Sequence, residues 1–382
     1  MPLNNYITTK MKNPFQTYGY NGPEYFCDRI AETQRLTSLL TNGNHVALIS
    51  PRRMGKTGLI RHCFAQQDMR SEYYLFIVDI YATRSLSELT YELGRTILST
   101  LKSRGRKSWK RFIQIAGSLR TGITLDAFGQ PVWNLEMGDI QSPQTSLDEI
   151  FRYLNTADKP CIVAIDEFQS ITDYPEQNVE ALLRTHIQQC NNARFVFSGS
   201  KRHMMGEMFS SPARPFYQSA STISLKPITL ESYASFITHH FEEGGKHILP
   251  EAISHIYERF EGVTWYIQKI CNELYAMTAT DSTCGMKDVD LAINSAINDN
   301  EDTYKDLLSR LTTKQKSLLM AIAHSKSDIK PTSGEFIKKH NLKSSSSVQR
   351  SLLALLDKDI ITSADGKYYI YDYFLNIWLN RR

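Results

Sequence analysis

Three residues at the end of an apolar run are suited to binding a phosphate group. Gly55, Lys56 and Thr57 close the segment SPRRMGKT, which follows the apolar residues of HVALIS. Backbone N–H groups of such a loop converge on phosphate oxygens, the lysine reaches the β- and γ-phosphates, and the hydroxyl can ligate Mg²⁺. We therefore predict a loop that binds a nucleoside triphosphate. Its residues are Ser50, Pro51, Arg52, Arg53, Met54, Gly55, Lys56, Thr57 and Gly58, with Ser50 where the usual pattern has its first glycine.

Two adjacent acids provide the second candidate feature. Asp166 and Glu167 follow the apolar run CIVAI, and α/β proteins bind ligands at the carboxyl edge of their parallel strands. We assign Asp166, together with Thr57, to a Mg²⁺ ion, and Glu167 to the water that attacks the phosphate. Neighbouring residues of a strand point to opposite sides, which fits two different roles. Glu167 and Lys56 make up the predicted catalytic pair.

Two serines follow a third apolar run. Ser198 and Ser200 stand in RFVFSGSKRHMM, and a hydroxyl there is placed beside Asp166 if the two strands are neighbours. We predict that one of them senses the terminal phosphate or positions water. The alternative is an ordinary Ser-Gly turn that leaves a strand.

Each of these motifs follows one of five short apolar segments, which we predict to be strands. The predicted strands are 45–50, 74–80, 161–166, 194–199 and 221–225, and the predicted helices around them are 29–41, 57–67, 85–103, 145–156, 176–190 and 201–210. Runs that are apolar on both faces are typical of a parallel sheet covered by helices. The predicted fold class is therefore α/β, with a parallel sheet sandwiched between helical layers.

Changes in the periodicity of the apolar residues along the chain predict three domains. Residues 1–228 form the nucleotide-binding domain, with an insertion at about 101–144 that contains a β-hairpin in GITLDAFGQPVW. Helical periodicity without strands marks a helical domain at 229–300. At 301–382, three short helices precede two strands joined at Asp365-Gly366, which predicts a winged helix-turn-helix domain.

The composition excludes several classes of protein. The 382 residues, 41% hydrophobic and 22% charged, are typical of a globular chain with two or three domains. No apolar run reaches the roughly 20 residues of a membrane helix, and MPLNNYITTKMKNPF lacks an export signal. Six scattered cysteines without a CxxC fit reduced thiols. We expect a cytoplasmic protein with no membrane partner.

Basic residues are concentrated in two segments, although the net charge is only +4. Residues 101–122 hold seven Lys and Arg and no acid. This segment is either a solvated helical connector or a contact for an anionic surface. Residues 306–382 hold thirteen Lys and Arg against seven Asp and Glu. This winged helix either contacts duplex DNA or packs against protein. The candidate DNA contacts are Ser345, Ser346, Gln349, Arg350 and Lys367.

Five segments occur in an order that characterises one protein family: FCDRIAETQRL, SPRRMGKT, IDEFQSI, FSGSKRHMM and YDYFLNIWL. In these segments, which span nearly the whole chain, it resembles the archaeal-type P-loop ATPases, a branch of the AAA+/STAND group that is also widespread in bacteria. The resemblance implies an ASCE-type nucleotide domain, a helical lid and a C-terminal winged helix, with ATP and Mg²⁺ as ligands. It also implies that Phe26 and Arg29 lie beside the adenine.

Two segments depart from the family's pattern. PFYQSA at 215–220 has Gln218 and Ser219 where members often carry an arginine, and Gly262-Val263-Thr264 lacks the proline common in the lid. An arginine supplied to the phosphate is worth about 10³–10⁵ in turnover. We therefore expect slow hydrolysis, or an arginine supplied by Arg202, Arg214 or a partner.

Three functions are open at this point. The first is a molecular switch in which ATP and Mg²⁺ order the lid, reorient the winged helix and signal to a protein partner, and hydrolysis resets it. The second is an ATPase that acts on duplex DNA as a regulator or in replication. The third is a scaffold that binds nucleotide without turnover. The sequence leaves the partner, the oligomeric state and the choice of purine undecided.

Overall fold

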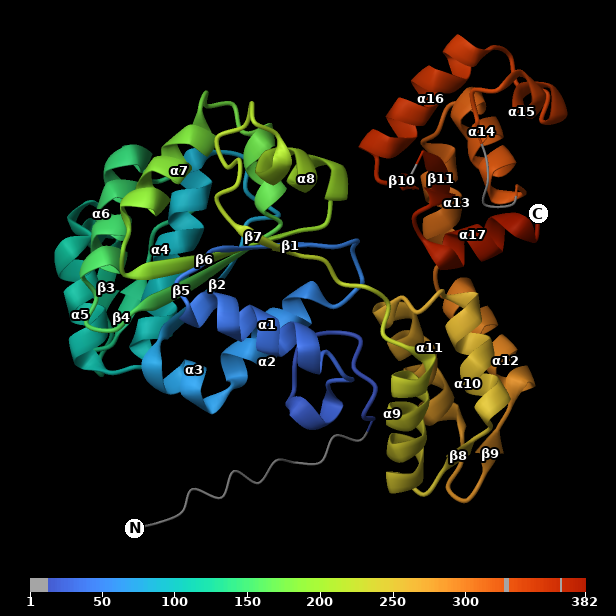
Figure 1. The fold of residues 1–382 in the computed structure, drawn as a ribbon, viewed down its shortest axis with the longest axis horizontal. Coiled ribbons are helices and arrows are strands. Elements are labelled where there is room, and N and C mark those ends of the chain that lie inside the picture. The colour runs from blue at the N-terminus through green and yellow to red at the C-terminus, as the bar shows by residue number, and fades with distance from the viewer. Residues whose placement is uncertain (1–12, 326–329, 365) are drawn as a thin grey trace. The chain divides into compact units, whose positions relative to one another are not determined.

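The computed structural model describes residues 13–325, 330–364 and 366–382 (Figure 1). The N-terminal segment used above to argue against export, up to residue 12, and Asp365 of the predicted turn lie outside the described residues. The chain forms two compact units, one of residues 14–236 with 262–266, and one that holds 237–261 and 267–382. No helix in the described part of the chain has the length and hydrophobicity that spanning a bilayer requires.

A five-stranded sheet organises the first unit. Its strands are β1 (Val46–Ile49), β2 (Tyr74–Asp79), β5 (Cys161–Asp166), β6 (Ala193–Gly199) and β7 (Ser221–Ile223). Their order is β2-β5-β6-β1-β7, and every neighbouring pair is parallel. All five predicted strands are confirmed, and so is the α/β fold class. Because the strands are parallel, the loops after β1, β5 and β6 all leave the same edge of the sheet.

Helices cover both faces of this sheet (Figure 1). On one face lie α1 (Ile30–Thr41), α2 (Lys56–Ala65) and α3 (Gln67–Glu72); on the other lie α4 (Leu86–Lys102), α5 (Arg106–Ile115), α6 (Pro143–Thr156), α7 (Val179–Gln189) and α8 (Arg202–Ser210). A hydrophobic core lies on each face of the sheet, and alternate residues of β1 pack into one or the other. Val46 and Leu48 pack on the side of α1 and α2, and Ala47 and Ile49 pack on the opposite side. Three short 3-10 helices, η1 (Pro23–Tyr25), η2 (Gly117–Gly122) and η3 (Phe168–Asp173), complete the unit.

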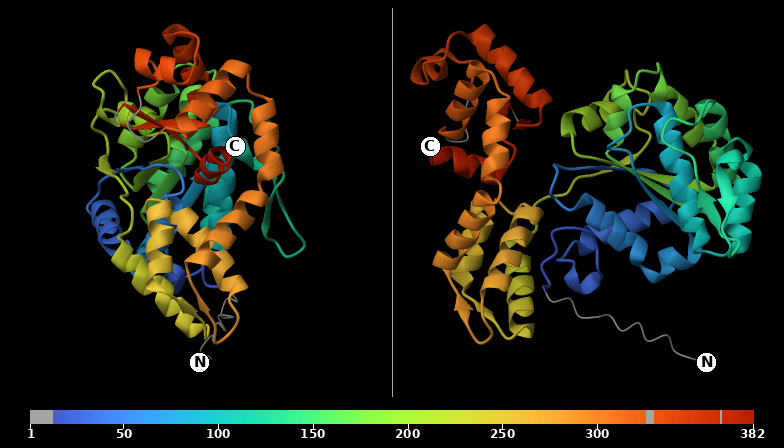
Figure 2. Two further views of the ribbon diagram at one scale, coloured as in Figure 1. Left: turned by 90° about the vertical axis from the view of Figure 1, so that its right-hand side faces the viewer. Right: turned by 180° about the vertical axis from the view of Figure 1, so that it is seen from behind.

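The predicted insertion is a helix followed by a hairpin. After α5 and η2, β3 (Ile123–Leu125) pairs antiparallel with β4 (Pro131–Trp133), which confirms the hairpin. Its tip extends away from the helices (Figure 2), and Phe128 there is 90% exposed. The base packs against α4, where a Cβ at Gly94 would lie 2.8 Å from the Trp133 ring. A glycine inside α4 therefore provides the space that the hairpin needs.

The second unit begins with a helical region. It contains parts or all of α9 (Leu230–Glu243), α10 (Pro250–Arg259), α11 (Thr264–Met277), α12 (Met286–Asn298) and α13 (Glu301–Ser309). The prediction that this region has no strands is wrong, because β8 (His247–Ile248) and β9 (Thr283–Cys284) form a parallel pair. Gly245 follows the end of α9 and Asp281 lies in the turn before β9, both at positive φ. Strands of two residues are too short to show a periodicity.

The winged helix predicted at the C-terminus is present. It consists of α14 (Thr313–Ala323), α15 (Gly334–Lys339), α16 (Ser345–Asp357), the antiparallel hairpin of β10 (Ile361–Ala364) and β11 (Lys367–Ile370), and α17 (Tyr373–Asn380) (Figure 2). The hydroxyls of Thr312, Ser333 and Ser344 each accept a hydrogen bond from the backbone N–H three residues on, so local sequence starts all three helices.

The apolar C-terminal segment is covered inside this second unit. α17 packs against α12 and α14, with Phe374 against Phe260 and Trp378 against Tyr304 at ring distances of 5.5 Å each. The aromatic side chains of this segment therefore join the winged helix to the helical region.

Candidate nucleotide-binding site

The loop between β1 and α2 has the backbone of a phosphate-binding loop. Arg53 and Gly55 are in the left-handed region at φ values of 68° and 90°, and α2 starts directly afterwards at Lys56. The Lys56 ammonium donates to the carbonyls of Ser50 and Pro51, at 2.8 and 3.0 Å. The fully buried Ser50 hydroxyl donates to the Leu225 carbonyl at 3.2 Å. This hydroxyl is therefore held by the segment that follows β7, not by the loop itself.

Lys56 is buried, with 6% of its surface exposed. Burial lowers its pKa to about 8, against the opposing attraction of Glu167 and Asp166. A charged amine that lacks water is stabilised by a nearby anion. The lysine is therefore placed to gain from a phosphate that enters the loop.

Thr57 and Asp166 meet at the sheet edge. The Thr57 hydroxyl donates to Asp166 Oδ2 at 2.6 Å, although 109 residues separate them in the sequence. Hydroxyl and carboxylate oxygens are the ligands that Mg²⁺ prefers, so this pair fits the ion that the sequence predicted. Asp79, opposite Asp166 in the β2–β5 register, is a third carboxylate that sequence reasoning missed. Burial raises the pKa of Asp79, and the negative charges of Asp166 and Glu167 raise it further.

Glu167 leaves the strand through a left-handed backbone conformation, at φ 55°. Its Oε2 accepts hydrogen bonds from the Ser200 hydroxyl at 2.7 Å and from the Gln169 amide at 2.5 Å. Arg52 Nε donates in turn to Ser200 Oγ at 3.2 Å. The carboxylate at the mouth of the site is thus held by two neutral donors, one in η3 and one just after β6.

The two candidate serines differ in position. Ser200 contacts Glu167, whereas Ser198 lies inside the sheet opposite Leu48 and is fully buried. The Ser198 hydroxyl has no hydrogen-bond partner in the described part of the chain. Of the two, only Ser200 is brought to the acids. Gln169 was not predicted; its position two residues after Glu167 was the available signal.

A second segment that sequence reasoning missed lies against the phosphate loop. Within the first unit, the Trp265 N–H donates to the Arg53 carbonyl at 3.0 Å, and the Thr264 hydroxyl to that of Met54 at 3.4 Å. The Arg53 guanidinium lies 4.4 Å from the Trp265 ring centroid and hydrogen-bonds the Tyr266 hydroxyl. The threonine thus makes a loop contact at the point where the family often has proline.

The residues assigned to the adenine by resemblance have contacts inside the protein. Phe26 stacks on His62 of α2, with ring centroids 4.3 Å apart. Arg29, 4% exposed, donates to the carbonyls of Lys226 at 2.7 Å and Met54 at 3.3 Å. Arg29 therefore holds the phosphate loop from behind in this structure. Arg214, a candidate for the catalytic arginine, is ion-paired with Glu180.

The candidate DNA contacts lie on the winged helix, in the other unit. Ser345, Ser346, Gln349 and Arg350 are exposed on the first turns of α16, and Lys367 is half-buried at the start of β11. Arg350 Nε donates to the Ser346 carbonyl at 3.4 Å, its one hydrogen bond within the described part of the chain. The structure thus places four of the five residues together on one helix.

Two family models match the chain. One, described as an ATPase domain predominantly from Archaea, matches residues 26–270, which is more than half of the sequence. The chain belongs to this family. The second, a probable winged helix domain, matches residues 302–381 of this archaeal-type ATPase. The resemblance seen in the sequence is therefore confirmed. The sequence has no match among curated proteins.

Solved structures share the fold of this archaeal-type ATPase over nearly its full length. A Walker-type ATPase of Pyrococcus abyssi matches with a TM-score of 0.66 at 19% identity, covering 96% of this chain and 99% of the other. The Orc2 protein of Aeropyrum pernix, solved with ADPNP and ADP, gives 0.56 at 16% identity, with 97% and 96% covered. The Orc1 protein of Aeropyrum pernix, solved with DNA, gives 0.50 at 13% identity, with 94% and 93% covered.

Proposed function

We propose that this ATPase is a nucleotide-operated switch that binds ATP with Mg²⁺, hydrolyses it slowly and uses its winged helix as the output module. The observation that carries the proposal is the Thr57–Asp166 hydrogen bond of 2.6 Å beside Lys56, with Glu167 held at the same sheet edge. Loop, acid pair and lysine are the parts that phosphoryl transfer to water requires.

Binding rests on the phosphate loop. Its N–H groups and the start of α2 would face the phosphates, and Lys56 would exchange the carbonyls of Ser50 and Pro51 for phosphate oxygens. Thr57 and Asp166 would hold the Mg²⁺ ion, which spreads the negative charge of the β- and γ-phosphates when bound.

Hydrolysis rests on Glu167. A carboxylate at the mouth of the site can accept a proton from the attacking water, and its hydrogen bonds to Ser200 and Gln169 fix its direction. We expect slow turnover because Arg214 is already paired with Glu180 and Gln218 stands where the family often has arginine.

The switch is supported by the contact between the loop and the start of α11. Trp265 and Thr264 hydrogen-bond the carbonyls of Arg53 and Met54, and α11 begins at Thr264. A nucleotide that rearranges Arg53 must break or reshape these contacts, and the remainder of α11 belongs to the second unit. A protein partner that reads this change, and membership of the STAND subgroup, are part of the proposal.

A calorimetric titration with ATP and Mg²⁺ tests the binding step. Lys56→Ala is expected to weaken binding by at least about tenfold, since charged hydrogen bonds are worth about 1.5–3 kcal/mol. Lys107→Ala, at an exposed side chain of α5, is the matched control and should bind like the unmodified chain. Equal affinity of the Lys56 variant and the control would refute the proposed site. GTP in the same assay decides the choice of purine.

Binding of duplex DNA is the second candidate function. It is favoured by the exposed Ser345, Ser346, Gln349 and Arg350 on α16 and by the net charge of +6 over residues 306–382. Affinity for a duplex should then fall steeply with salt and depend on Arg350. Arg350→Ala should weaken binding while Lys358→Ala, at the other end of α16, should not. Binding that is the same for both variants would exclude this surface as the DNA contact.

A further inference from the structure

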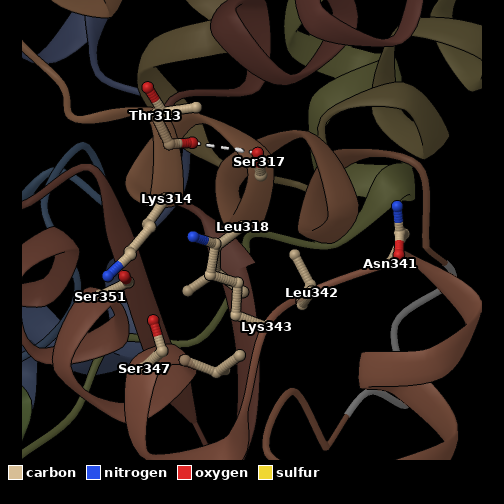
Figure 3. Close-up of a pocket in the computed structure, with 10 residues that line it drawn as sticks. Thr313, Lys314, Ser317, Leu318, Asn341, Leu342, Lys343, Ser347 and Ser351 are labelled. Atoms are coloured by element: carbon tan, nitrogen blue, oxygen red, sulfur yellow. Dashed lines mark hydrogen bonds between the residues drawn. The ribbon is translucent and has the colours of Figure 1, made fainter.

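A half-open cavity of about 120 Å³ lies in the winged helix, between α14, the turn before α16 and α16 itself (Figure 3). Lys314 and Ser317 line it from α14, Lys343 from the turn, and Ser347 and Ser351 from α16. Figure 3 shows the α14 residues and Ser347 on opposite sides of the space, with Asn341 and Leu342 beside it. Leu318 and Val348 are its buried apolar lining.

Two serine side chains with little exposure line this cavity. Ser347 and Ser351, both on α16, are 9% and 7% exposed. The backbone N–H of Ser347 donates to the Ser344 hydroxyl. The side-chain hydroxyls of Ser347 and Ser351 can donate hydrogen bonds to a polar group that enters the cavity.

The charges around the cavity point to an anion. Lys314 and Lys343 are exposed at its rim, and neither has an ion pair within the described ranges. No Asp or Glu lines the cavity. Lys314 also stands in the first turn of α14, where the helix dipole favours negative charge. Ammonium groups and hydroxyls together are the donors that a compact oxyanion requires.

We propose that this cavity binds a phosphate group, with Lys314 and Lys343 supplying charge and Ser347 and Ser351 donating hydrogen bonds. None of these residues belongs to the phosphate loop or to the candidate DNA contacts. The proposal therefore goes beyond the proposed function and is independent of ATP hydrolysis. The phosphate belongs either to a small phosphorylated molecule or to a nucleic-acid backbone, which share this chemistry.

Lysine acetylation of the full chain, read residue by residue by mass spectrometry, tests the site. The probe is inorganic phosphate, compared with sodium chloride at equal ionic strength. At two-thirds occupancy, phosphate should slow acetylation of Lys314 and Lys343 about threefold. Lys338 and Lys339, exposed on α15 and outside the cavity, are the matched controls and should not change. Unchanged rates at the first pair, or equal slowing of all four lysines, would overturn the proposal.

A hydroxyl variant separates binding from simple screening. The double variant Ser347→Ala with Ser351→Ala should lose the protection while the control lysines keep their rates; full protection without the hydroxyls contradicts the site. Ser351→Ala alone serves if the double variant does not fold. A short DNA duplex decides the source: protection by both probes supports a backbone phosphate, and protection by inorganic phosphate alone supports a small molecule. Protection by the duplex alone counts against the cavity.

Discussion

At the scale of single residues, the pKa of Lys56 gives a prediction for nucleotide binding. Burial lowers this pKa to about 8 in the structure, and bound phosphate must raise it. ATP binding above pH 8 then takes up a proton, so affinity should fall as pH rises, by up to about tenfold per unit. Lys56→Met should bind weakly without this pH dependence. Titrations from pH 7 to 9.5 check it, and a constant affinity of the unmodified chain would count against the assigned role.

The donors to Glu167 give a second prediction. Ser200→Ala removes the 2.7 Å hydrogen bond to its carboxylate, and a hydrogen bond to a charged group is worth about 1.5–3 kcal/mol. We expect kcat for ATP to fall about tenfold or more, with ATP affinity unchanged, because the serine acts through Glu167. Ser198→Ala is the matched control, since this buried side chain does not contact Glu167 by any described hydrogen bond. The same loss in both variants would mean a general structural effect.

Residue types predicted part of the site. Lys56, Thr57, Asp166 and Glu167 were assigned from the sequence. The structure brings Thr57 and Asp166 together at the sheet edge where β1 and β5 end, as that assignment requires. Ser198 and Ser200 were not distinguished, because the choice depends on which of them lies past the end of β6. The contact of Trp265 with Arg53 was not foreseen, since 212 residues separate the two and no motif marks it.

At the scale of elements, the close packing at the end of β6 is testable. A Cβ on Gly199 would lie 2.5 Å from the Gln169 Oε1 and from Met205 Cγ. Gly199→Ala should therefore displace Gln169 from Glu167, reduce turnover and cost about 1–3 kcal/mol of unfolding free energy. Gly206→Ala, with open space around it in α8, should stabilise by up to about 1 kcal/mol. Urea unfolding and phosphate release measure both; a neutral Gly199→Ala would contradict this packing.

The helix α17 gives the prediction for the second unit. Trp378 is 5% exposed and packs against Tyr304, so Trp378→Ala should cost about 3–5 kcal/mol in the unit's unfolding free energy. Leu353→Ala, at a side chain that is 54% exposed, should change it by less than about 0.5 kcal/mol. Chemical unfolding followed by circular dichroism compares them. A small loss for Trp378→Ala would mean that α17 does not join the winged helix to the helical region.

Elements were predicted where the periodicity was long enough to read. The five strands and the hairpin of the insertion stand at the predicted places because each has an apolar run or a turn signal. The β8–β9 pair was missed because two residues carry no period. The packing of α12 against the aromatic C-terminal helix α17 could not be predicted from the sequence either, because it is a contact between distant segments.

At the scale of the whole molecule, the proposed chemistry and the proposed output module lie in different compact units. The phosphate loop, the acid pair and Ser200 belong to the first unit, whereas α16 and the cavity between α14 and α16 belong to the second. α9 and α11 have residues in both. A ligand can change the output only by its differential affinity for two arrangements. The domain boundaries at 228 and 300, and a place in the cytoplasm, stay predictions.

The most direct test of the central claim is steady-state phosphate release from ATP by the purified chain, with Mg²⁺ and then with EDTA. The account predicts slow, Mg²⁺-dependent release that Glu167→Gln abolishes while ATP binding is kept, since a general base contributes about 10²–10⁴-fold. Duplex DNA at low salt, added to the same assay, shows whether DNA stimulates turnover. Release that is equal in the unmodified chain and in Glu167→Gln, or no release above background in either, would contradict hydrolysis at this site and leave a nucleotide-binding scaffold.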